Sequence, residues 1–314
     1  MQNKYLINSA KKFWFWFWTK LMSGFAPSDA QGNYKRPKGI LVNKTNDFKS
    51  NNENSYLLVG NSCPWCHRTL LVYTLKKLSK KVKVIFLEAD INNGQWVFNE
   101  KFKGCKTLQQ FYKKAQKNNI FRSTLPLLCN FRNNKINILS SESSQIVKLL
   151  NSISGESSKK ILQINNCDQD LLDLIHSDIN DGVYKCGFAR NQASYEKASN
   201  SLFKGLSQLE NKFLKSSSNW ICGEELTYAD IYLFPTVIRW ELIYRQLFKC
   251  TEKEISDFKH ITRWRLRFFE LSNVADTCFD SEWKKDYYKA LFPLNPNQII
   301  PILPSLKEIM QSIS

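Results

Sequence analysis

The sequence lacks a long apolar run. The nearest candidate is Phe13-Trp14-Phe15-Trp16-Phe17-Trp18, which follows Lys11-Lys12 and is interrupted by Thr19-Lys20. A membrane-spanning helix needs about 20 apolar residues, and a secretory signal needs an aliphatic core and a small-residue cleavage site. The aromatic run meets neither requirement, so we predict no transmembrane segment. We expect its rings to pack on the protein's own surface, with peripheral membrane contact through Trp and Lys as the alternative.

Complete metal-ligand motifs are missing as well. A C-x-x-C occurs at Cys63 and Cys66, but no second C-x-x-C or H-x₃₋₅-H completes a zinc site, and the sequence has three histidines. Nine cysteines in 314 residues are too few and too irregularly spaced for a disulfide scaffold. We therefore expect no metal, a cytoplasmic protein with reduced thiols, and a redox or nucleophilic cysteine rather than a zinc half-site or a buried core pair.

Acidic residues are scarce relative to basic ones, 28 against 45, and the net charge is +17. A basic surface attracts anionic ligands. The lysines are scattered, however, and the sequence contains no continuous basic run and no zinc-finger, RNA-recognition or helix-turn-helix signature, so we expect no nucleic-acid partner. With 314 residues, 43% of them hydrophobic, the chain is long enough for two cores.

The most informative stretch is Cys63-Pro64-Trp65-Cys66-His67-Arg68, which lies between an apolar run at 56–59 and a helical pattern at 69–75. This order predicts strand, tight turn and helix. A cysteine at the start of a helix meets unpaired N–H groups and the positive end of the helix dipole, and both stabilise a thiolate. Pro64 suits the first helical position, where a missing N–H costs nothing.

The segments around this turn alternate in type. Residues 1–50 have the composition of a loop-rich extension wrapped on the body. A strand at 56–59, a helix at 64–79 and a strand at 82–87 form a βαβ unit, and after a long polar insertion through about 120 come strands at 125–129 and 136–139 and a helix at 140–150. This order is typical of a thioredoxin-like domain, an α/β fold.

Two further features of this domain predict a ligand site. A cis bond at Pro126 would turn the backbone of Leu125 towards Cys63, where it pairs with an extended peptide. The helix start at Glu142 and Ser143 offers N–H donors to a carboxylate and an acid to an amine. Together these features describe a site for glutathione.

Beyond about residue 157 the strands stop and helical spacing takes over, at 168–182, 191–215, 227–248, 254–272 and 282–290. Thr227 and Asp230 form the pattern of a capping box, a structural motif. We therefore expect an extension at 1–50, a thioredoxin-like glutathione-binding domain at 51–156 and an all-α domain at 157–314.

The pattern C-P-W-x-H-R-T-L, followed by G-x-x-L-T-x-A-D in a helical domain, resembles a cytosolic glutathione transferase. The stretches at 179–189, 239–250, 286–288 and 295–301 are similar to the Xi class, the glutathionyl-hydroquinone reductases, and the resemblance covers about residues 56–304. It implies that Cys63 attacks the glutathione sulfur of a glutathionyl-hydroquinone, releases the hydroquinone and forms a mixed disulfide. A second glutathione then regenerates the thiolate and leaves as oxidised glutathione.

The resemblance also implies roles for other residues and a homodimer. Glutathione, the co-substrate, is contacted by Trp96, Arg122, Leu125, Pro126, Glu142 and Ser143. The hydroquinone pocket contains two tyrosines whose hydroxyls bond the ring oxygens and help to protonate the leaving carbon, Tyr184 and Tyr287. Arg68 and the helix start supply part of the thiolate stabilisation.

The chain departs from the family pattern at Cys66 and Cys186, where the family usually has alanine. Cys66 is either a small buried substitute for alanine, which we favour, or a resolving thiol as in a dithiol glutaredoxin. An omega-type thiol transferase or dehydroascorbate reductase, which would use the same Cys63 on mixed disulfides or dehydroascorbate, is an alternative. A conjugating transferase would need Ser or Tyr in place of Cys63. The alternative of another class is a non-catalytic binding protein on the same fold.

Overall fold

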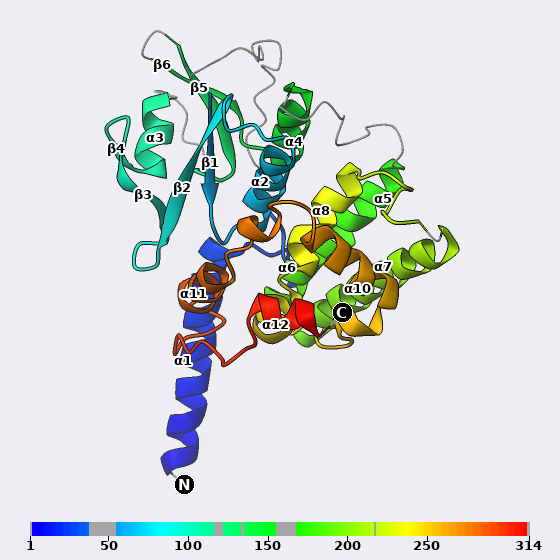
Figure 1. Cartoon of the computed structure of the whole chain (residues 1–314). Helices are drawn as coiled ribbons and strands as arrows, with labels where there is room; N and C mark the ends of the chain where they lie inside the picture. The colour runs from blue at the N-terminus through cyan, green and yellow to red at the C-terminus, as the bar shows by residue number, and fades with distance from the viewer. Residues whose placement is uncertain are drawn as a thin grey trace.

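The computed structural model describes residues 2–37, 55–115, 122–132, 135–154, 168–216 and 218–312. The domain boundaries expected at residues 50 and 156 lie outside the described residues. Figure 1 shows a sheet layer, a helical layer beside it and a long N-terminal helix that projects from the body.

The first layer is a six-stranded sheet in the order β4-β3-β2-β1-β5-β6. Its central strand β1 is parallel to β2 and antiparallel to β5, and every residue of β1 is buried. Helices α2 and α4 pack side by side on the sheet (Figure 1). The elements are β1 (Ser55–Gly60), α2 (Pro64–Leu75), β2 (Val82–Asp90), β3 (Gln95–Phe102), β4 (Cys105–Thr107), α3 (Leu108–Ala115), β5 (Leu127–Arg132), β6 (Lys135–Ser140) and α4 (Ser143–Ser152).

The β1-α2-β2-β5-β6-α4 order confirms the predicted thioredoxin-like fold. The expectation of a plain polar insertion before residue 120 was incomplete, because β3, β4 and α3 lie there and extend the sheet beyond β2. The residues of β3 are mostly exposed or half-buried. A strand that buries so little of either face carries no alternating apolar pattern, which is why the sequence did not reveal it.

The second layer is all helical, as predicted. Asp230, at the third position of α8, accepts hydrogen bonds from the backbone N–H and the hydroxyl of Thr227, so the predicted capping box is present. The elements are α5 (Gln169–Leu174), the π-helix η2 (Ile175–Asn180), α6 (Gly182–Gly187), α7 (Gln192–Ser216), α8 (Tyr228–Val237), the π-helix η3 (Trp240–Tyr244), α9 (Arg245–Leu247), η4 (Ile255–Asp257), α10 (Lys259–Phe269), η5 (Ala275–Thr277), α11 (Asp280–Ala290) and α12 (Leu306–Gln311).

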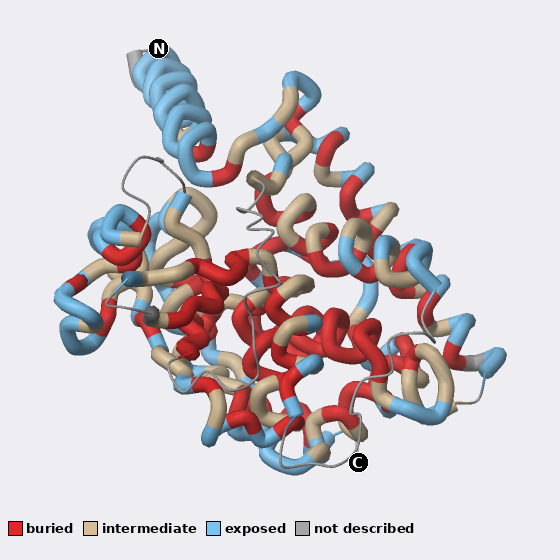
Figure 2. The backbone as a smooth tube through the Cα atoms, turned by 90° about the horizontal axis from the view of Figure 1, so that it is seen from above, coloured by how far each residue is buried: buried red, intermediate tan, exposed pale blue. Residues whose placement is uncertain are grey.

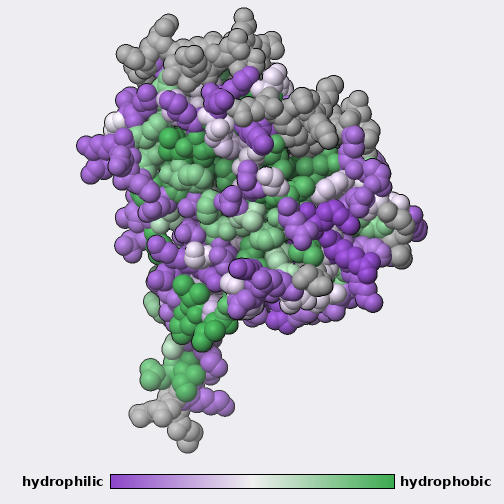
Figure 3. Space-filling view, viewed as in Figure 1, coloured by the Kyte–Doolittle hydropathy of each residue, from purple (hydrophilic) through white to green (hydrophobic). Residues whose placement is uncertain are grey.

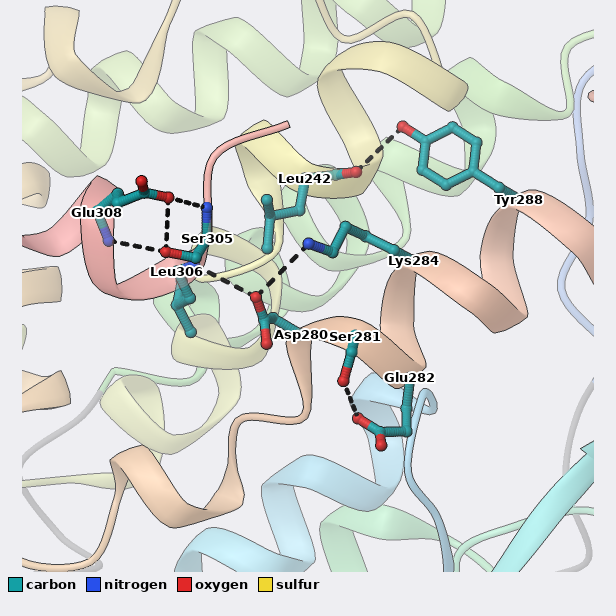
Figure 4. Close-up of polar contacts among 9 residues, drawn as sticks. All are labelled: Leu242, Asp280, Ser281, Glu282, Lys284, Tyr288, Ser305, Leu306 and Glu308. Carbon is teal, nitrogen blue, oxygen red and sulfur yellow. Dashed lines mark hydrogen bonds and ion pairs between the residues drawn. The ribbon is translucent and has the colours of Figure 1, made fainter. Parts of the chain in front are cut away.

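The C-terminal helix α12 is held against α11 by polar contacts (Figure 4). The Ser305 hydroxyl accepts from the N–H of Glu308, and the Glu308 carboxylate accepts from the N–H of Ser305, which caps the helix start. The N–H of Leu306 also donates to the carboxylate of Asp280, at the first position of α11. The chain end is thereby fixed to the helical layer.

The first half of the N-terminal extension is a helix where loops were predicted, and the described residues of the second half wrap onto the body as predicted. Residues Gln2–Phe25 form the 24-residue helix α1, where loops were expected. The rings of residues 13–17 are exposed and do not pack on the protein surface as expected, whereas Trp18, the last ring of the run, does. Figure 2 shows α1 exposed along most of its length. The residues after α1 do wrap onto the body: the N–H of Arg190 donates to the Gly32 carbonyl, and Arg36 pairs with Asp181 at 2.6 Å.

Buried residues concentrate between and within the two layers (Figure 2). The layers are joined by specific contacts near the β1–α2 turn, where the indole N–H of Trp283 on α11 donates to the Asn61 carbonyl at 3.0 Å. Among the described residues, every helix is too short or too polar to cross a membrane.

Candidate active site

Cys63 lies at the junction of β1 and α2, as predicted. It is the residue that caps α2, Pro64 occupies the first helical turn, and the Cys63 Sγ accepts a hydrogen bond from the N–H of Cys66 at 3.4 Å. The Leu125–Pro126 peptide bond is cis, and the Leu125 carbonyl oxygen is 4.0 Å from the Cys63 Sγ. The geometry therefore brings the predicted nucleophile to the predicted backbone-pairing residue.

The surroundings of Cys63 favour its thiolate. Its pKa is lowered to about 7, chiefly by a hydrogen bond from the Cys66 thiol, although burial opposes the shift. The N–H groups of Cys66 and Trp65 and the charge of Arg239 lower this pKa further. The pKa of Cys66 lies well above its ordinary value because of burial and the neighbouring Cys63. Near pH 7 a substantial fraction of Cys63 is therefore thiolate, while the Cys66 thiol stays protonated.

Arg239 is a fully buried cation beside this pair. Its guanidinium lies 3.7 Å from the centre of the Trp283 ring, and its Nη1 donates to the Pro235 carbonyl and to the His67 Nδ1, both at 2.9 Å. The Arg239 Nε and Nη2 have no hydrogen-bond partner in the part of the chain that the structure describes. A buried guanidinium with free donors contributes an uncompensated positive charge to the site.

His67 is a neutral bridge between the layers. Burial and Arg239 hold its pKa well below the ordinary value. Because Arg239 can only donate, His67 Nδ1 accepts, so its proton is on Nε2 and donates to the Thr277 Oγ1 at 2.8 Å. The Thr277 hydroxyl in turn donates to the Val274 carbonyl. These contacts give His67 a structural role and fix Arg239 beside Cys63.

Three tyrosine hydroxyls form a cluster on the helical side of the site. Tyr184 and Tyr287 are 2.6 Å apart, and Tyr244 is 3.4 Å from Tyr287. Burial raises the pKa of all three, so they are protonated at neutral pH. The structure thus brings together the two tyrosines that the sequence pattern singled out and adds a third.

Comparison with known proteins places this arrangement in a family. The model of the glutathione S-transferase C-terminal domain matches residues 192–267. Glutathionyl-hydroquinone reductase PcpF of Sphingobium chlorophenolicum is 31% identical over 304 residues, which cover 88% of this chain and 94% of that protein. Glutathionyl-hydroquinone reductase YqjG of Escherichia coli is 29% identical, with 83% of this chain and 82% of that protein covered.

Solved structures agree with these relatives. The glutathione-S-transferase Xi from Phanerochaete chrysosporium matches with a TM-score of 0.80 and 27% identity over 88% of this chain and 94% of that one. The glutathione-bound structure of YqjG matches with a TM-score of 0.72 and 28% identity over 82% of this chain and 87% of that one. The chain belongs to the Xi class of the glutathione transferases.

In this Xi-class transferase the remaining predicted residues lie on β3, at the start of α4 and in the segment before β5. The Trp96 ring covers Gly60, at the end of β1, so closely that a Cβ at Gly60 would lie 2.5 Å from it. Glu142 is the capping residue of α4 and Ser143 its first helical residue, as predicted. Arg122 is exposed, and its charge opposes the burial-raised pKa of Tyr34.

Arg68 and Arg36 surround the Trp65 ring. The Arg68 guanidinium is 4.2 Å from the centre of that ring and 4.7 Å from the centre of Tyr232, and burial lowers the pKa of Arg68 to about 10. Arg36 lies 4.3 Å from the centre of Trp65 and 4.8 Å from that of Tyr184. Two cations thus flank the helix start that holds Cys63.

Three of these residues had no role in the sequence analysis. Arg239 and Tyr244 lie inside a stretch that marked the family, yet a single sequence does not show that the charge of Arg239 acts on Cys63. Arg36 lies in a segment that read as loop, and no local pattern connects it with Tyr184. Their positions depend on packing between the two layers.

Proposed function

We propose that this transferase is a glutathione-dependent oxidoreductase that removes glutathione from glutathionyl-hydroquinones through Cys63. The observation that carries the proposal is that one buried cation, Arg239, acts on the pKa of the cysteine nucleophile and on the pKa of the tyrosines. The charge of Arg239 lowers the pKa of Cys63 and opposes the burial that raises the pKa of Tyr244 and Tyr287. The nucleophile and the phenolic donors therefore lie around the same charge, as attack on sulfur and protonation of the leaving group require.

Glutathione would bind as an added strand along the Leu125 backbone, with its γ-glutamyl end at the start of α4. The N–H groups at Glu142 and Ser143 suit the carboxylate, and the Glu142 side chain suits the amine. Trp96 and the cations Arg36 and Arg122 would face the same anionic ligand. This placement directs the glutathione sulfur towards Cys63.

The chemistry then proceeds in two displacement steps. The Cys63 thiolate attacks the glutathione sulfur of the conjugate, a sulfur–sulfur bond forms, and the carbon–sulfur bond to the aromatic ring breaks. The Tyr184–Tyr287 pair delivers a proton to the ring carbon, which completes the hydroquinone. A second glutathione then loses its thiol proton, which restores the tyrosine pair, and its thiolate attacks the mixed disulfide, so that oxidised glutathione leaves and the Cys63 thiolate returns. Two sulfurs are oxidised and one carbon is reduced overall.

The relatives named glutathionyl-hydroquinone reductase support this substrate class, and the glutathione-bound relative supports the co-substrate. We place the reaction in the cytoplasm, because the nucleophile requires a reduced thiol. The family resemblance also leads us to propose a homodimer, which sedimentation equilibrium would measure. No step of the proposed chemistry calls for a metal.

The test is glutathione-dependent turnover of a glutathionyl-hydroquinone by the wild-type protein and by Cys63→Ser. We expect turnover in the wild type and none in the variant. The buried Cys129→Ala serves as a matched control for the loss of a thiol and should keep the activity. Full activity of Cys63→Ser would overturn the mechanism, and absence of both turnover and glutathione binding in the wild type would favour the non-catalytic binding protein.

A second candidate rests on Cys66, whose N–H donates to the Cys63 Sγ at 3.4 Å and whose thiol lowers the pKa of Cys63. In a dithiol or omega-type reaction Cys66 would resolve the Cys63 mixed disulfide during reduction of hydroxyethyl disulfide or dehydroascorbate. The Cys66→Ser variant keeps a hydroxyl donor and removes the second sulfur. If it lost disulfide reduction while hydroquinone release continued, the dithiol reaction would be an additional activity.

A further inference from the structure

Helix α1 is the largest feature that the glutathione chemistry leaves unexplained. It projects from the body beside α11 (Figure 1), and Figure 3 shows hydrophobic surface along it and at its base. Five consecutive rings on it are exposed: Phe13 65%, Trp14 49%, Phe15 62%, Trp16 57% and Phe17 38%. So many adjacent exposed aromatic residues mark an interaction surface.

The base of α1 is fixed to the protein. The Trp18 indole N–H donates to the Pro293 carbonyl at 2.8 Å, and the Arg190 guanidinium lies 5.3 Å from the centre of the Trp18 ring. Met22 is fully buried, and the Phe25 ring packs edge-on against Phe188 at 6.0 Å. The exposed rings therefore begin directly beyond an anchored turn and have a set direction relative to the body.

The distribution of the rings identifies the kind of partner. Consecutive helical residues are about 100° apart, so the run at 13–17 presents rings on every side of α1. A protein groove or a second helix covers one face of such a helix. At a bilayer surface the rings that face the membrane enter the boundary between headgroups and acyl chains, and those on the flanks of the helix lie among the headgroups.

The charge on α1 identifies the lipid. Gln2–Phe25 contains no acidic residue, whereas Lys4, Lys11, Lys12 and Lys20 are all exposed. Two copies of α1 packed together would bring these lysines close with no carboxylate on either helix to offset them. Anionic phospholipid headgroups supply the opposite charge, and long lysine side chains reach headgroups from the edge of the acyl region.

We propose that α1 anchors this enzyme to the surface of an anionic phospholipid bilayer, with residues 13–17 inserted at the interface and the lysines at the headgroups. Trp side chains are enriched at the membrane–water interface, where the ring lies at the level of the headgroups. One further exposed apolar residue extends the surface at the base of α1: Phe292 (38%) precedes Pro293, whose carbonyl accepts from Trp18. The inference goes beyond the proposed reaction, which does not require a membrane.

The experiment is flotation of the full chain with phosphatidylcholine vesicles that contain or lack phosphatidylserine. We expect binding that depends on phosphatidylserine and weakens with salt. Since each lysine near such a surface contributes about 1 kcal/mol, the double variant Lys11→Gln with Lys12→Gln should lose about thirtyfold in partition coefficient. Trp14→Ser with Trp16→Ser should lose binding as well.

The matched control is Lys212→Gln with Lys215→Gln, which removes the same charge from exposed positions of α7 and should change binding less than twofold. Tryptophan emission should shift to the blue on vesicle addition in the wild type and not in the Trp14/Trp16 variant. Equal flotation of the Trp14/Trp16 variant and the wild type would overturn the proposal. So would concentration-dependent self-association through α1 with no vesicle binding. Cys63 alkylation reports that each variant is folded.

Discussion

At the scale of single residues, the reactivity of Cys63 depends on a few donors that each act on one sulfur. The helix start supplies two N–H groups, and Cys66 supplies a thiol whose own pKa is raised by burial. Burial of Cys63 works in the opposite direction. The lowered pKa is thus a balance that single substitutions shift, and the direction of each shift follows from the charge or donor removed.

The first prediction concerns the Cys66→Ala variant. In the wild type, the rate of Cys63 alkylation by iodoacetamide should rise with pH, reach half its maximum near pH 7, where the pKa lies, and level off above it. Removal of the thiol donor destabilises the thiolate, so the midpoint should move to higher pH. Mass spectrometry of the labelled peptide measures the rate at Cys63 alone. An unchanged midpoint would contradict the assigned hydrogen bond, and Cys129→Ala is the control.

The second prediction concerns Arg239, which we infer to be a positioning residue. Arg239→Met should raise the alkylation midpoint, by less than Cys66→Ala because Arg239 is the smaller cause, and should slow alkylation at pH 7 about two- to threefold. Arg239→Lys keeps a positive charge and should restore part of the shift.

A merely structural role for Arg239 would not move the pH profile. Arg265→Met provides the comparison, because Arg265 is equally buried but pairs with Glu241 at 2.8 Å in the helical layer. If Arg265→Met and Arg239→Met shifted the Cys63 midpoint alike, the effect would come from general destabilisation. Thermal unfolding of both variants measures that destabilisation independently.

At the scale of helices and strands, the sequence predicted those features that depend on residues close together in the chain. The turn at Cys63 and the capping box at Thr227 each arise from neighbouring residues and were predictable, whereas the cis bond before Pro126 was expected from the thioredoxin-like order of elements. Helix α1 was missed because its aromatic run has no 3.6-residue periodicity and the glycines and prolines after Phe25 dominated the composition of the segment. The local pattern there indicated a loop.

The π-helices explain why the tyrosine cluster was harder to foresee. The segment η2 (Ile175–Asn180) precedes Tyr184 by one turn, and η3 (Trp240–Tyr244) ends at Tyr244. An extra residue in a turn rotates every side chain that follows, and it often does so at functional sites. Helical periodicity read from the sequence assumes 3.6 residues per turn throughout. It therefore does not predict which side of the helix carries Tyr184 or Tyr244.

The third prediction uses helix α11, which presents Tyr287 to the cluster and Tyr288 to another partner. The double variant Tyr184→Phe with Tyr287→Phe should lower hydroquinone release about a hundredfold, because proton delivery to the leaving carbon is lost. Reduction of hydroxyethyl disulfide, which needs no such proton, should change little. Initial rates with both substrates measure the difference.

The matched control is Tyr288→Phe. The Tyr288 hydroxyl donates to the Leu242 carbonyl at 3.0 Å (Figure 4). This variant removes the same atom from the neighbouring residue and should leave the ratio of the two activities unchanged. Equal losses on both substrates in the Tyr184/Tyr287 variant would assign the tyrosines to structure rather than to protonation.

At the scale of the whole molecule, composition predicted the number of hydrophobic cores, whereas packing between the two layers determines which residues surround Cys63. The chain length and hydrophobic content indicated two cores, and the structure has two layers. Contacts between those layers, such as Trp283 to Asn61 and Arg239 to His67, join residues more than 170 positions apart. A single sequence contains no signal for contacts at such separations, so the buried cation at the nucleophile became visible only in the structure.

The last prediction concerns the net charge of +17. A positive field concentrates anions at the site, and salt screens it over about 10 Å at 0.1 M. Iodoacetate carries a negative charge and iodoacetamide does not, while both alkylate the same thiolate. The rate ratio of iodoacetate to iodoacetamide at Cys63 should therefore fall about tenfold from low to high salt. Alkylation quenched at set times and fixed pH measures both rates, and the iodoacetamide rate alone controls for any effect of salt on the thiolate.

A ratio independent of salt would contradict this prediction. It would mean that the excess of lysine and arginine does not attract anions to Cys63. The anionic co-substrate would then be held only by close contacts, such as those at the helix start at Ser143.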